Sequence, residues 1–243
     1  MEKKQLDKLV EQRVDAVIHL GGAADDVVTN QDYADHLNKV TGSIPVITTG
    51  KLDGTDCYRV QIDAVKALDL LLEHLVTNGN HRIALAGGRY DVVSTRVKYD
   101  RFMEKAKEYH LDVRPEYTDN WGSYNIFAGQ QTMDRMFGQL QKKNIPVPEA
   151  VIAINDQTAA GVIRSIESHG YRIPEDISVV SYDNVDIAKV IEPNITSVDY
   201  DFDHFGKTII ETAVAAMDGK QTDRQQYIEP TLVIRRSSDY RRS

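Results

Sequence analysis

The 243-residue sequence has one cysteine, one tryptophan, 7% aromatic residues and no excess of basic side chains. Cys57 alone can form neither an intramolecular disulfide nor a cysteine-based zinc cluster, which fits a reducing cytosol. The formal net charge is -8. This charge argues against nucleic-acid binding by the chain itself, because lysine and arginine must neutralise the phosphates of the backbone. The absences therefore exclude a disulfide-stapled domain and argue against nucleic-acid binding by this chain.

Long apolar runs and recognisable cofactor motifs are also lacking. The first residues, MEKKQLDKLVEQRVDAVIHLGG, predict a charged amphipathic helix in place of a signal peptide or membrane span. The seven histidines show no metal-ligand spacing, and LAGG lacks the remaining residues of a dinucleotide or phosphate loop. We therefore expect a cytoplasmic protein with no metal and no cofactor.

What the sequence does contain is an alternation of short β-branched runs with segments of helical period, which is typical of a parallel α/β sheet. Strands are predicted over residues 14–20, 44–49, 58–62, 82–87, 150–154 and 177–182, with later extended pieces at ITSVDY and TLVIRR. Helices are predicted over residues 64–79, 95–110, 125–143, 156–170 and 205–217. With 41% hydrophobic residues, the chain can form one large domain or two modest ones.

Polar side chains follow several of these predicted strands. Asp63, Asn155 and Asp183 each come directly after a strand, and Arg96 begins the helix that follows the fourth strand. Trp121 stands just before another helix. Ligands of open parallel sheets bind at the carboxyl ends of the strands. A guanidinium, an amide, carboxylates and an indole face together suit a small polyhydroxylated ligand.

Each of these residues also has a purely structural interpretation. Asn155 or Asp156 is a good helix N-cap, and Asp183 could form an Asx-turn. Arg96 could be a solvated charge and Trp121 a core residue. Single signals are weak, but their common position at strand ends favours a binding cleft.

Several long segments resemble the effector-binding domain of LacI/GalR-type transcriptional repressors, which is built like the periplasmic sugar-binding proteins. The longest is NDQTAAGVIRSIESHGYRIPEDISVVSYDNVDIAKVIEPNITSVDYD, with its Asn-Asp start and its Ile-Ser-Val-Val strand before an Asp-rich turn. DAVKALDLLLEHLVTNGNHRIALAGG, VSTRVKYDRFMEKAKEYHLDV and LVIRRSS are similar to further family segments. The similarity covers nearly the whole chain.

The resemblance implies a two-lobed periplasmic-binding-protein-like fold of type I, each lobe a parallel sheet flanked by helices. The amino-side lobe would hold residues 1–78 and 202–228, the carboxyl-side lobe residues 80–198 and 230–243, with a hinge near 79, 199–201 and 229. It also implies an effector cleft lined by Asp63, Arg96, Trp121, Asn155, Asp183 and Phe202. Asn155 would face the ligand while Asp156 caps the following helix, and Trp121 and Phe202 would sandwich a sugar ring.

The sequence departs from the family pattern at three single positions and at its beginning. Arg101 and Ser181 stand where glycine is usual, and Ala64 where asparagine often follows the aspartate. Family members also carry a helix-turn-helix headpiece, a hinge helix and a first strand, helix and strand ahead of the segment matching residues 1–15. The resemblance therefore implies an incomplete amino-side lobe, and operator DNA contact only through a headpiece that this sequence does not contain.

The expected function is that of a sugar-sensing domain in a homodimeric repressor, where the effector changes the lobe orientation and thereby DNA binding by the headpiece. The alternative is the extracytoplasmic sugar-binding protein of a transporter, which shares the fold. A sugar hydrolase or kinase is the third class, but Asp63 and Asp183 are expected on opposite lobes without a nucleophile, phosphate loop or metal between them. We therefore predict no enzymatic activity.

Overall fold

The computed structural model describes residues 2–42, 44–119 and 122–242, which divide into two compact units. Unit 1 consists of Met1–Asp63, Asp91–Ser94 and Asp201–Glu229. Unit 2 consists of Ala64–Tyr90, Thr95–Tyr200 and Pro230–Ser243. Each unit is therefore assembled from three separate pieces of the chain.

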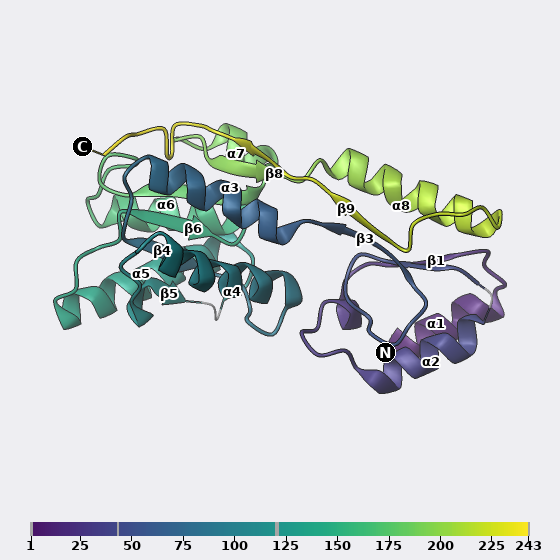
Figure 1. Cartoon of the computed structure of the whole chain (residues 1–243). Coiled ribbons are helices and arrows are strands. Elements are labelled where there is room, and N and C mark those ends of the chain that lie inside the picture. Colours follow the sequence, from purple (N-terminus) through teal and green to yellow (C-terminus); the bar gives the residue numbers. More distant parts are fainter. Residues whose placement is uncertain (1, 43, 120–121, 243) are drawn as a thin grey trace. The chain divides into compact units, whose positions relative to one another are not determined.

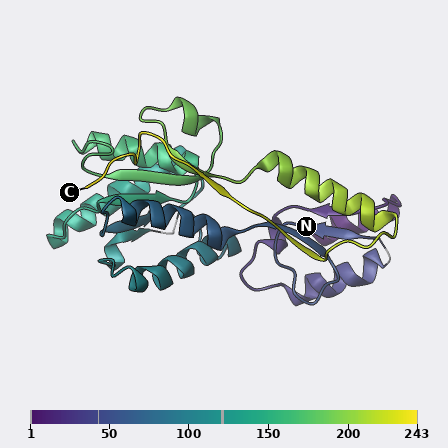
Figure 2. The ribbon, with the colours of Figure 1, turned by 45° about the horizontal axis from the view of Figure 1, so that its top comes forward.

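Unit 1 is a four-stranded parallel sheet with helices on both faces. Its strands, in spatial order, are β1 (Val17–His19), β2 (Val46–Thr48), β3 (Tyr58–Ile62) and β9 (Gln225–Ile228). Its helices are α1 (Glu2–Glu11), α2 (Gln31–Thr41) and α8 (Phe202–Met217), with a 3-10 turn at Gly22–Ala24. Figure 1 and Figure 2 show α8 on one face of this sheet and α1 and α2 on the other.

The two faces of the unit 1 sheet have separate hydrophobic clusters. Leu6 of α1 and Leu37 of α2 pack with Val17 and Val46 on one face, whereas Ile209 of α8 belongs to a smaller cluster on the other. Side chains of successive strand residues point to opposite faces, so neighbours such as Val46 and Ile47 serve different clusters. The core of unit 1 is thus two thin layers.

Unit 2 is a six-stranded sheet in the order β10-β8-β7-β6-β4-β5, parallel except for β10, which runs antiparallel to β8. The strands are β4 (Ile83–Ala86), β5 (Thr118–Asp119), β6 (Ala150–Ala153), β7 (Ser178–Asp183), β8 (Thr196–Asp199) and β10 (Thr231–Val233). The helices are α3 (Ala64–Thr77), α4 (Val93–Glu108), α5 (Ile126–Lys143), α6 (Asp156–Ser168) and α7 (Asp186–Val190), with a 3-10 turn at Pro115–Tyr117. The first two residues of α4 group with unit 1.

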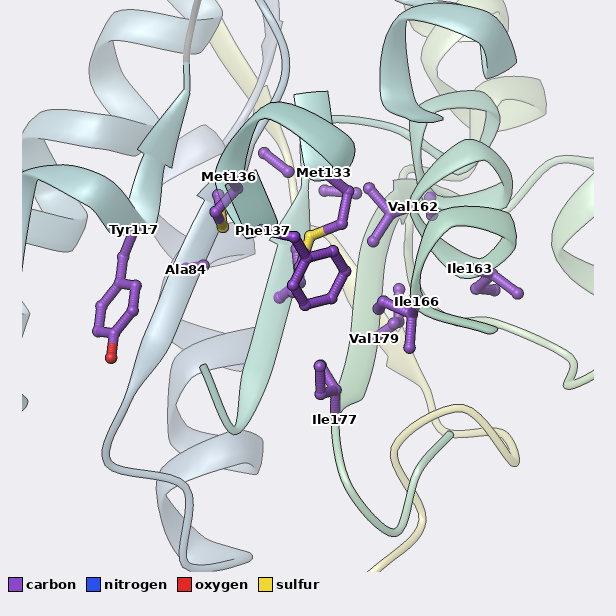
Figure 3. Close-up of a cluster of buried hydrophobic side chains, with 14 of the residues drawn as sticks. Ala84, Tyr117, Met133, Met136, Phe137, Val162, Ile163, Ile166, Ile177 and Val179 are labelled. Atoms are coloured by element: carbon purple, nitrogen blue, oxygen red, sulfur yellow. The ribbon is translucent and has the colours of Figure 1, made fainter. Parts of the chain in front are cut away.

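Helices α5 and α6 cover one face of the unit 2 sheet. Figure 3 shows Met133 and Phe137 of α5 beside Val162 and Ile166 of α6, over the strand residue Val179. The helices approach closely because glycines lie at their contact. A Cβ on Gly129 would lie 2.1 Å from the Thr158 carbonyl oxygen, and one on Gly161 would lie 2.0 Å from the Ile126 carbonyl oxygen.

The other face of the unit 2 sheet is covered by α3 and α4. Leucines of α3 are completely buried where this helix packs against β7, β8 and β10, namely Leu68, Leu71, Leu72 and Leu75. On α4, Tyr99 and Phe102 are buried, and Tyr99 lines a small cavity together with Leu85 and Ile152. These strand residues alternate with those under α5 and α6, which places α4 on the opposite face.

The predicted α/β class with parallel sheets is confirmed, but the division into units differs from the expected lobes at two places. Residues 64–78 were assigned to the amino-side lobe, whereas the structure groups them with unit 2, because the leucine stripe of α3 packs on the unit 2 sheet. Asp91–Ser94 groups with unit 1, where Val92 pairs with Asp26 in an isolated bridge. The chain also passes from unit 2 to unit 1 between Tyr200 and Asp201, and back to unit 2 between Glu229 and Pro230.

Candidate ligand-binding site

The candidate site in unit 2 lies at the carboxyl ends of β4, β6 and β7. These three strands are adjacent and parallel, with Ala86 beside Ala153 and Ile152 beside Val180. Gly87 follows β4 with a positive φ of 87°, and a Cβ there would lie 2.8 Å from the Thr158 methyl group. Glycine therefore lets the backbone turn sharply at this edge of the sheet. Asn155 and Asp183 stand at the ends of the neighbouring strands.

Lys98 and Asp183 are the charged pair of this edge. Lys98 is buried on α4, with its Nζ 3.8 Å from the centroid of the Tyr182 ring. Desolvation lowers the pKa of Lys98 to about 8, and the nearby Asp183 carboxylate opposes this shift. Desolvation likewise raises the pKa of Asp183 to about 6, opposed by Lys98. Each charge thus partly offsets the cost of burying the other.

The cavity beside Lys98 is too small to hold a ligand. Its volume is about 10 Å³, and it is lined by Tyr99, Tyr182 and aliphatic strand residues. This is room for about one water molecule. The ammonium group consequently has few alternatives to the aromatic ring and the carboxylate, which keeps it in place.

Asp183 and Asn184 turn the chain at the end of β7 in left-handed backbone conformations, with φ of 98° and 53°. Aspartate and asparagine tolerate the left-handed region better than other non-glycine residues, and hydrogen bonds hold this turn in it. The Asn184 backbone N–H donates to Ser197 Oγ at 3.0 Å, and its side-chain amide donates to Asp199 at 2.8 Å. Arg235 donates to the Asn184 side-chain oxygen at 2.6 Å. The turn that presents the Asp183 carboxyl is therefore held on several sides.

Asp156, the first residue of α6, hydrogen-bonds to residues around the same turn. It is completely buried and accepts hydrogen bonds from the hydroxyls of Ser181 and Ser197 and from the backbone N–H of Val185. Burial raises the pKa of Asp156, and the hydroxyl and backbone donors counteract that rise. Asp156 acts as a positioning residue that ties the start of α6 to the loop after β7.

The N-cap of α6 is Asn155 and not Asp156. The Asn155 side-chain oxygen accepts from the Thr158 N–H at 2.8 Å. Its amide group donates to the Tyr124 carbonyl oxygen at 3.2 Å. The prediction that Asp156 caps the helix is wrong, because its carboxylate is committed to the buried serines. Ligand binding by Asn155 stays a prediction.

Arg96 lies two residues before Lys98, and its side chain is committed elsewhere. Its Nε donates to Asp100 at 3.0 Å, and its guanidinium lies 4.0 Å from the centroid of the Tyr90 ring. The side chain is 39% exposed. The cation that the structure brings near Asp183 is therefore Lys98, which the sequence reasoning missed. The signal was present, because Lys98 shares a buried stripe with Thr95, Tyr99, Phe102 and Ala106.

Of the remaining predicted site residues, two belong to unit 1 and one is not described. Asp63 and Phe202 belong to unit 1, at the end of β3 and the first position of α8. The Asp63 N–H donates to the Ile228 carbonyl oxygen at 3.2 Å, and Phe202 is 47% exposed. Trp121 lies outside the described residues. The part of these three in ligand binding stays a prediction.

Within residues 2–42, 44–119 and 122–242, no group of three or more His, Cys, Asp or Glu is arranged to hold a metal ion. No helix formed by these residues is long and apolar enough to cross a membrane.

Comparison with known proteins defines the class of domain. Residues 72–238 match the family described as periplasmic binding protein-like domain, and the chain belongs to that family. Among curated proteins, the HTH-type transcriptional repressor PurR of Aliivibrio fischeri is 27% identical over 240 residues, covering 98% of this chain and 68% of that protein. Catabolite control protein A of Staphylococcus xylosus is 26% identical over 247 residues, covering 99% of this chain and 67% of that protein.

The solved structures narrow the class to one group of regulators. The lac repressor dimer bound to operator and the anti-inducer ONPF superimposes with a TM-score of 0.84 at 26% identity, covering 97% of this chain and 78% of that chain. The fold also matches a CelR-cellobiose complex, with a TM-score of 0.82 at 24% identity, covering 97% of this chain and 70% of that chain. The chain is an effector domain of the LacI-type transcriptional repressors. These relatives favour the repressor interpretation over the transporter alternative.

Proposed function

We propose that this chain binds a small carbohydrate or a derivative at the carboxyl edge of the unit 2 sheet and acts in the cytoplasm as the sensor of a homodimeric repressor. The observation that carries the proposal is the pairing of buried Lys98 with Asp183 on a turn held by Asp156 and Asn184. The Asp183 carboxylate offers acceptors to ligand hydroxyls, and the buried Lys98 ammonium favours its charged form. The carbohydrate class is also supported by the relative that was solved with cellobiose.

The charged pair is suited to recognition because it is rigid and costly to bury. Lys98 carries its charge against a depressed pKa, and Asp183 carries its charge against a raised pKa. Ligand hydroxyls that hydrogen-bond to Asp183 would stabilise its charged form without requiring the turn to move, while the buried Lys98 ammonium supports that carboxylate from within the protein. Asn155, Asp63, Phe202 and Trp121 complete the proposed ligand set on the strength of the family resemblance. Arg96 is retained as a peripheral contact.

The regulatory step follows from differential affinity. A ligand shifts a conformational equilibrium only to the extent that it binds the two states unequally. In the proposed mechanism the effector favours one arrangement of the two units, and the DNA-binding part of the repressor responds to it. Operator DNA is therefore a partner of the whole repressor and not of this chain alone.

Isothermal titration calorimetry of the full chain against mono- and disaccharides, phosphosugars and nucleobases tests the proposal. For the sugar that binds, Lys98→Met and Asp183→Asn should each weaken the affinity at least about tenfold, since hydrogen bonds to charged groups contribute about 1.5–3 kcal/mol. Arg96→Ala, which removes a neighbouring cation on the same helix, should have a smaller effect. Binding that depends on Arg96 and ignores both Lys98 and Asp183 would contradict this site.

We also propose that the chain does not transform its ligand. A sugar incubated with stoichiometric protein should be recovered unchanged by NMR. Conversion to a product that is lost in Asp183→Asn would instead establish an enzyme that uses the same residues.

A further inference from the structure

Unit 1 contains a cavity at the amino ends of β2 and β3. Its volume is about 420 Å³, and the described residues around it come from the end of α2, the starts of β2 and β3, Ala216 of α8 and Arg224 ahead of β9. This volume falls within the range of about 300–1,000 Å³ that is typical of small-molecule sites. All of these residues belong to unit 1, so the cavity can be described within that unit.

The cavity lies at the other end of β3 and α8 from two residues of the proposed sugar site. Asp63 follows β3 and Phe202 begins α8, whereas Tyr58 at the start of β3 and Ala216 near the end of α8 line the cavity. At a rise of about 1.5 Å per residue, Phe202 and Ala216 lie about 21 Å apart along α8. A small ligand in the cavity therefore does not touch Asp63 or Phe202.

Two charged residues line the cavity without forming an ion pair with each other. The Arg224 guanidinium donates through Nη1 to the Asp56 backbone carbonyl oxygen and lies 4.4 Å from the centroid of the Tyr58 ring. Among the residues that the structure describes, Arg224 Nε and Nη2 have no acceptor and the Asp56 carboxylate has no donor. A guanidinium edge and a carboxylate are thus both available to a ligand.

The end of α2 adds hydrogen-bond acceptors. Asn38, Thr41 and Gly42 line the cavity in and just after the last turn of this helix. The last carbonyl oxygens of a helix have no intrahelical partner, and the helix dipole places partial negative charge there. The Asn38 amide donates to the Gly54 carbonyl oxygen at 2.8 Å, which fixes this side chain and leaves its own oxygen as an acceptor. The helix end therefore favours a positively charged ligand group.

The inner wall of the cavity is apolar. Leu37, Val46 and Cys57 line it and are buried members of the hydrophobic cluster under α1 and α2, and Ile44 packs against that cluster. An aliphatic group placed here would be removed from water together with this wall, which is favourable.

We propose that this cavity binds a free α-amino acid with an aliphatic side chain. Arg224 holds the carboxylate through Nε and Nη2, because a guanidinium matches a carboxylate in such bidentate geometry. The ammonium group binds the acceptors at the end of α2 and the Asp56 carboxylate, and the side chain packs on Leu37 and Val46. Only a ligand that carries both charges satisfies the guanidinium and the acceptors together. The chain then has a second ligand site, which does not depend on sugar binding.

Isothermal titration calorimetry of the full chain with leucine, isoleucine, valine and methionine tests the proposal. Each amino acid is compared with the two analogues that lack one of its charges. For leucine these are isocaproate, which has no ammonium group, and isoamylamine, which has no carboxylate. The amino acid should bind at least about tenfold more tightly than either analogue, since each analogue loses hydrogen bonds between charged groups.

Variants of the lining locate the ligand. Arg224→Gln and Asp56→Asn should each weaken amino-acid binding at least about tenfold, because each removes one charged partner. Ala216→Phe should abolish binding by filling the cavity from α8. The matched control is Lys39→Gln, which removes a cation from the last turn of α2 at a position outside the lining and should bind as wild type does. Thermal unfolding of each variant verifies that it is folded.

The outcomes separate this site from the proposed sugar site. Amino-acid binding retained in Lys98→Met and Asp183→Asn is expected, whereas binding that is lost in these variants and survives Arg224→Gln would place the ligand in unit 2 and overturn the inference. An analogue that binds as tightly as its amino acid would also overturn it, as would an equal loss in Lys39→Gln. So would the absence of any amino acid that binds with a Kd below about 1 mM. Failure of sugar binding alone would leave it intact.

Discussion

Unit 2 buries a large cluster under α5 and α6 and further apolar side chains under α3 and α4, whereas the buried residues of unit 1 fall into two smaller clusters on opposite faces of a narrower sheet. The stability gained from burial scales with the apolar area removed from water. Unit 2 therefore has more apolar burial to offset the cost of burying polar groups. Its completely buried polar side chains include Asp156, Ser181 and Ser197, which hold the turn of the candidate site.

The two units differ in what holds their polar and apolar side chains. In unit 2, the carboxyl edge of the sheet is fixed by hydrogen bonds to buried donors and acceptors, which suits recognition of a small ligand. In unit 1, apolar side chains of α8 remain exposed, which suits contact with another large surface.

The largest expected effects come from core truncations that ask whether the two units unfold separately. Leu37→Ala in unit 1 and Phe102→Ala in unit 2 should each cost about 2–5 kcal/mol, because both side chains are completely buried. Hydrogen exchange measured by mass spectrometry across a urea series should show each variant destabilising chiefly its own unit. Equal loss of protection in both units would show that they unfold as one cooperative structure.

The second test concerns the close contact of α5 and α6, which has no counterpart in unit 1. Gly129→Ala should destabilise unit 2 by about 1–3 kcal/mol, because the new methyl group overlaps the Thr158 carbonyl. Gly138→Ala lies on the same helix in open space and should stabilise it by up to about 1 kcal/mol. Urea unfolding of both variants measures the difference. If both variants were stabilised, the helix propensity of alanine, and not the close contact with α6, would determine the stability of α5.

The third test uses pH to address the charged pair of unit 2. The pKa of Asp183 is raised to about 6, so the native state binds protons more tightly than the unfolded state, and stability should fall as the pH rises from about 4 to 6. The pKa of Lys98 is lowered to about 8, so the native state releases its proton first, and stability should rise between about pH 8 and 10.5. Unit 2 should thus be least stable between these windows.

Denaturant titrations at a series of pH values measure how the free energy of unfolding depends on pH. Asp183→Asn should flatten the acidic limb of this curve, where stability falls, and Lys98→Met should flatten the alkaline limb, where it rises. Each pKa unit corresponds to about 1.4 kcal/mol of unfolding free energy. Because Asp183 is partly exposed, solvent screening should make the change in its limb smaller than this conversion gives. Unchanged limbs in the variants would assign the pH dependence to other groups.

The smallest effects compare one interhelical ion pair in each unit. Arg101 of α4 forms two hydrogen bonds to Asp69 of α3, at 2.8 and 2.6 Å, and its side chain is 22% exposed. Arg101→Ala should cost about 1 kcal/mol. Lys3→Ala removes the pair between α1 and α2, where Asp32 is 85% exposed, and thermal unfolding should show no change. A greater loss from Lys3→Ala would reverse the ranking of the two units.

Elements with strong periodicity could be predicted from the sequence, whereas those that depend on distant partners could not. The leucine spacing of α3 and the β-branched runs of β6 and β7 each match their positions in the structure to within a few residues. No strand was predicted at β9, QQYI, because it is extended only through its pairing with β3, which lies far away in the sequence. The helix α2 was not named either, although Asn30 is a recognisable N-cap.

The sequence was sufficient to predict where the candidate site lies, but not which side chains contact one another in it. Parallel strands bring their carboxyl ends together, so Asn155 and Asp183 could be located at one edge. Which cation faces Asp183 depends on the rotation of α4 against the sheet, and local sequence does not determine that rotation. Two departures from the family pattern gain a physical role in the same way, since Ser181 donates to Asp156 and Arg101 joins α4 to α3.

The interleaving of the chain between the two units has a consequence for synthesis. Residues 230–243 supply β10 to unit 2, and Arg242 donates to the carbonyl oxygens of Glu149 and Asp176 and to the Asn80 side chain. Unit 1 is likewise incomplete without residues 201–229, which contribute α8 and β9. Neither unit can complete its sheet while these residues are still inside the ribosome. The nascent chain must therefore expose unfinished sheet edges until translation has passed Arg242, a period in which chaperone binding would be most valuable.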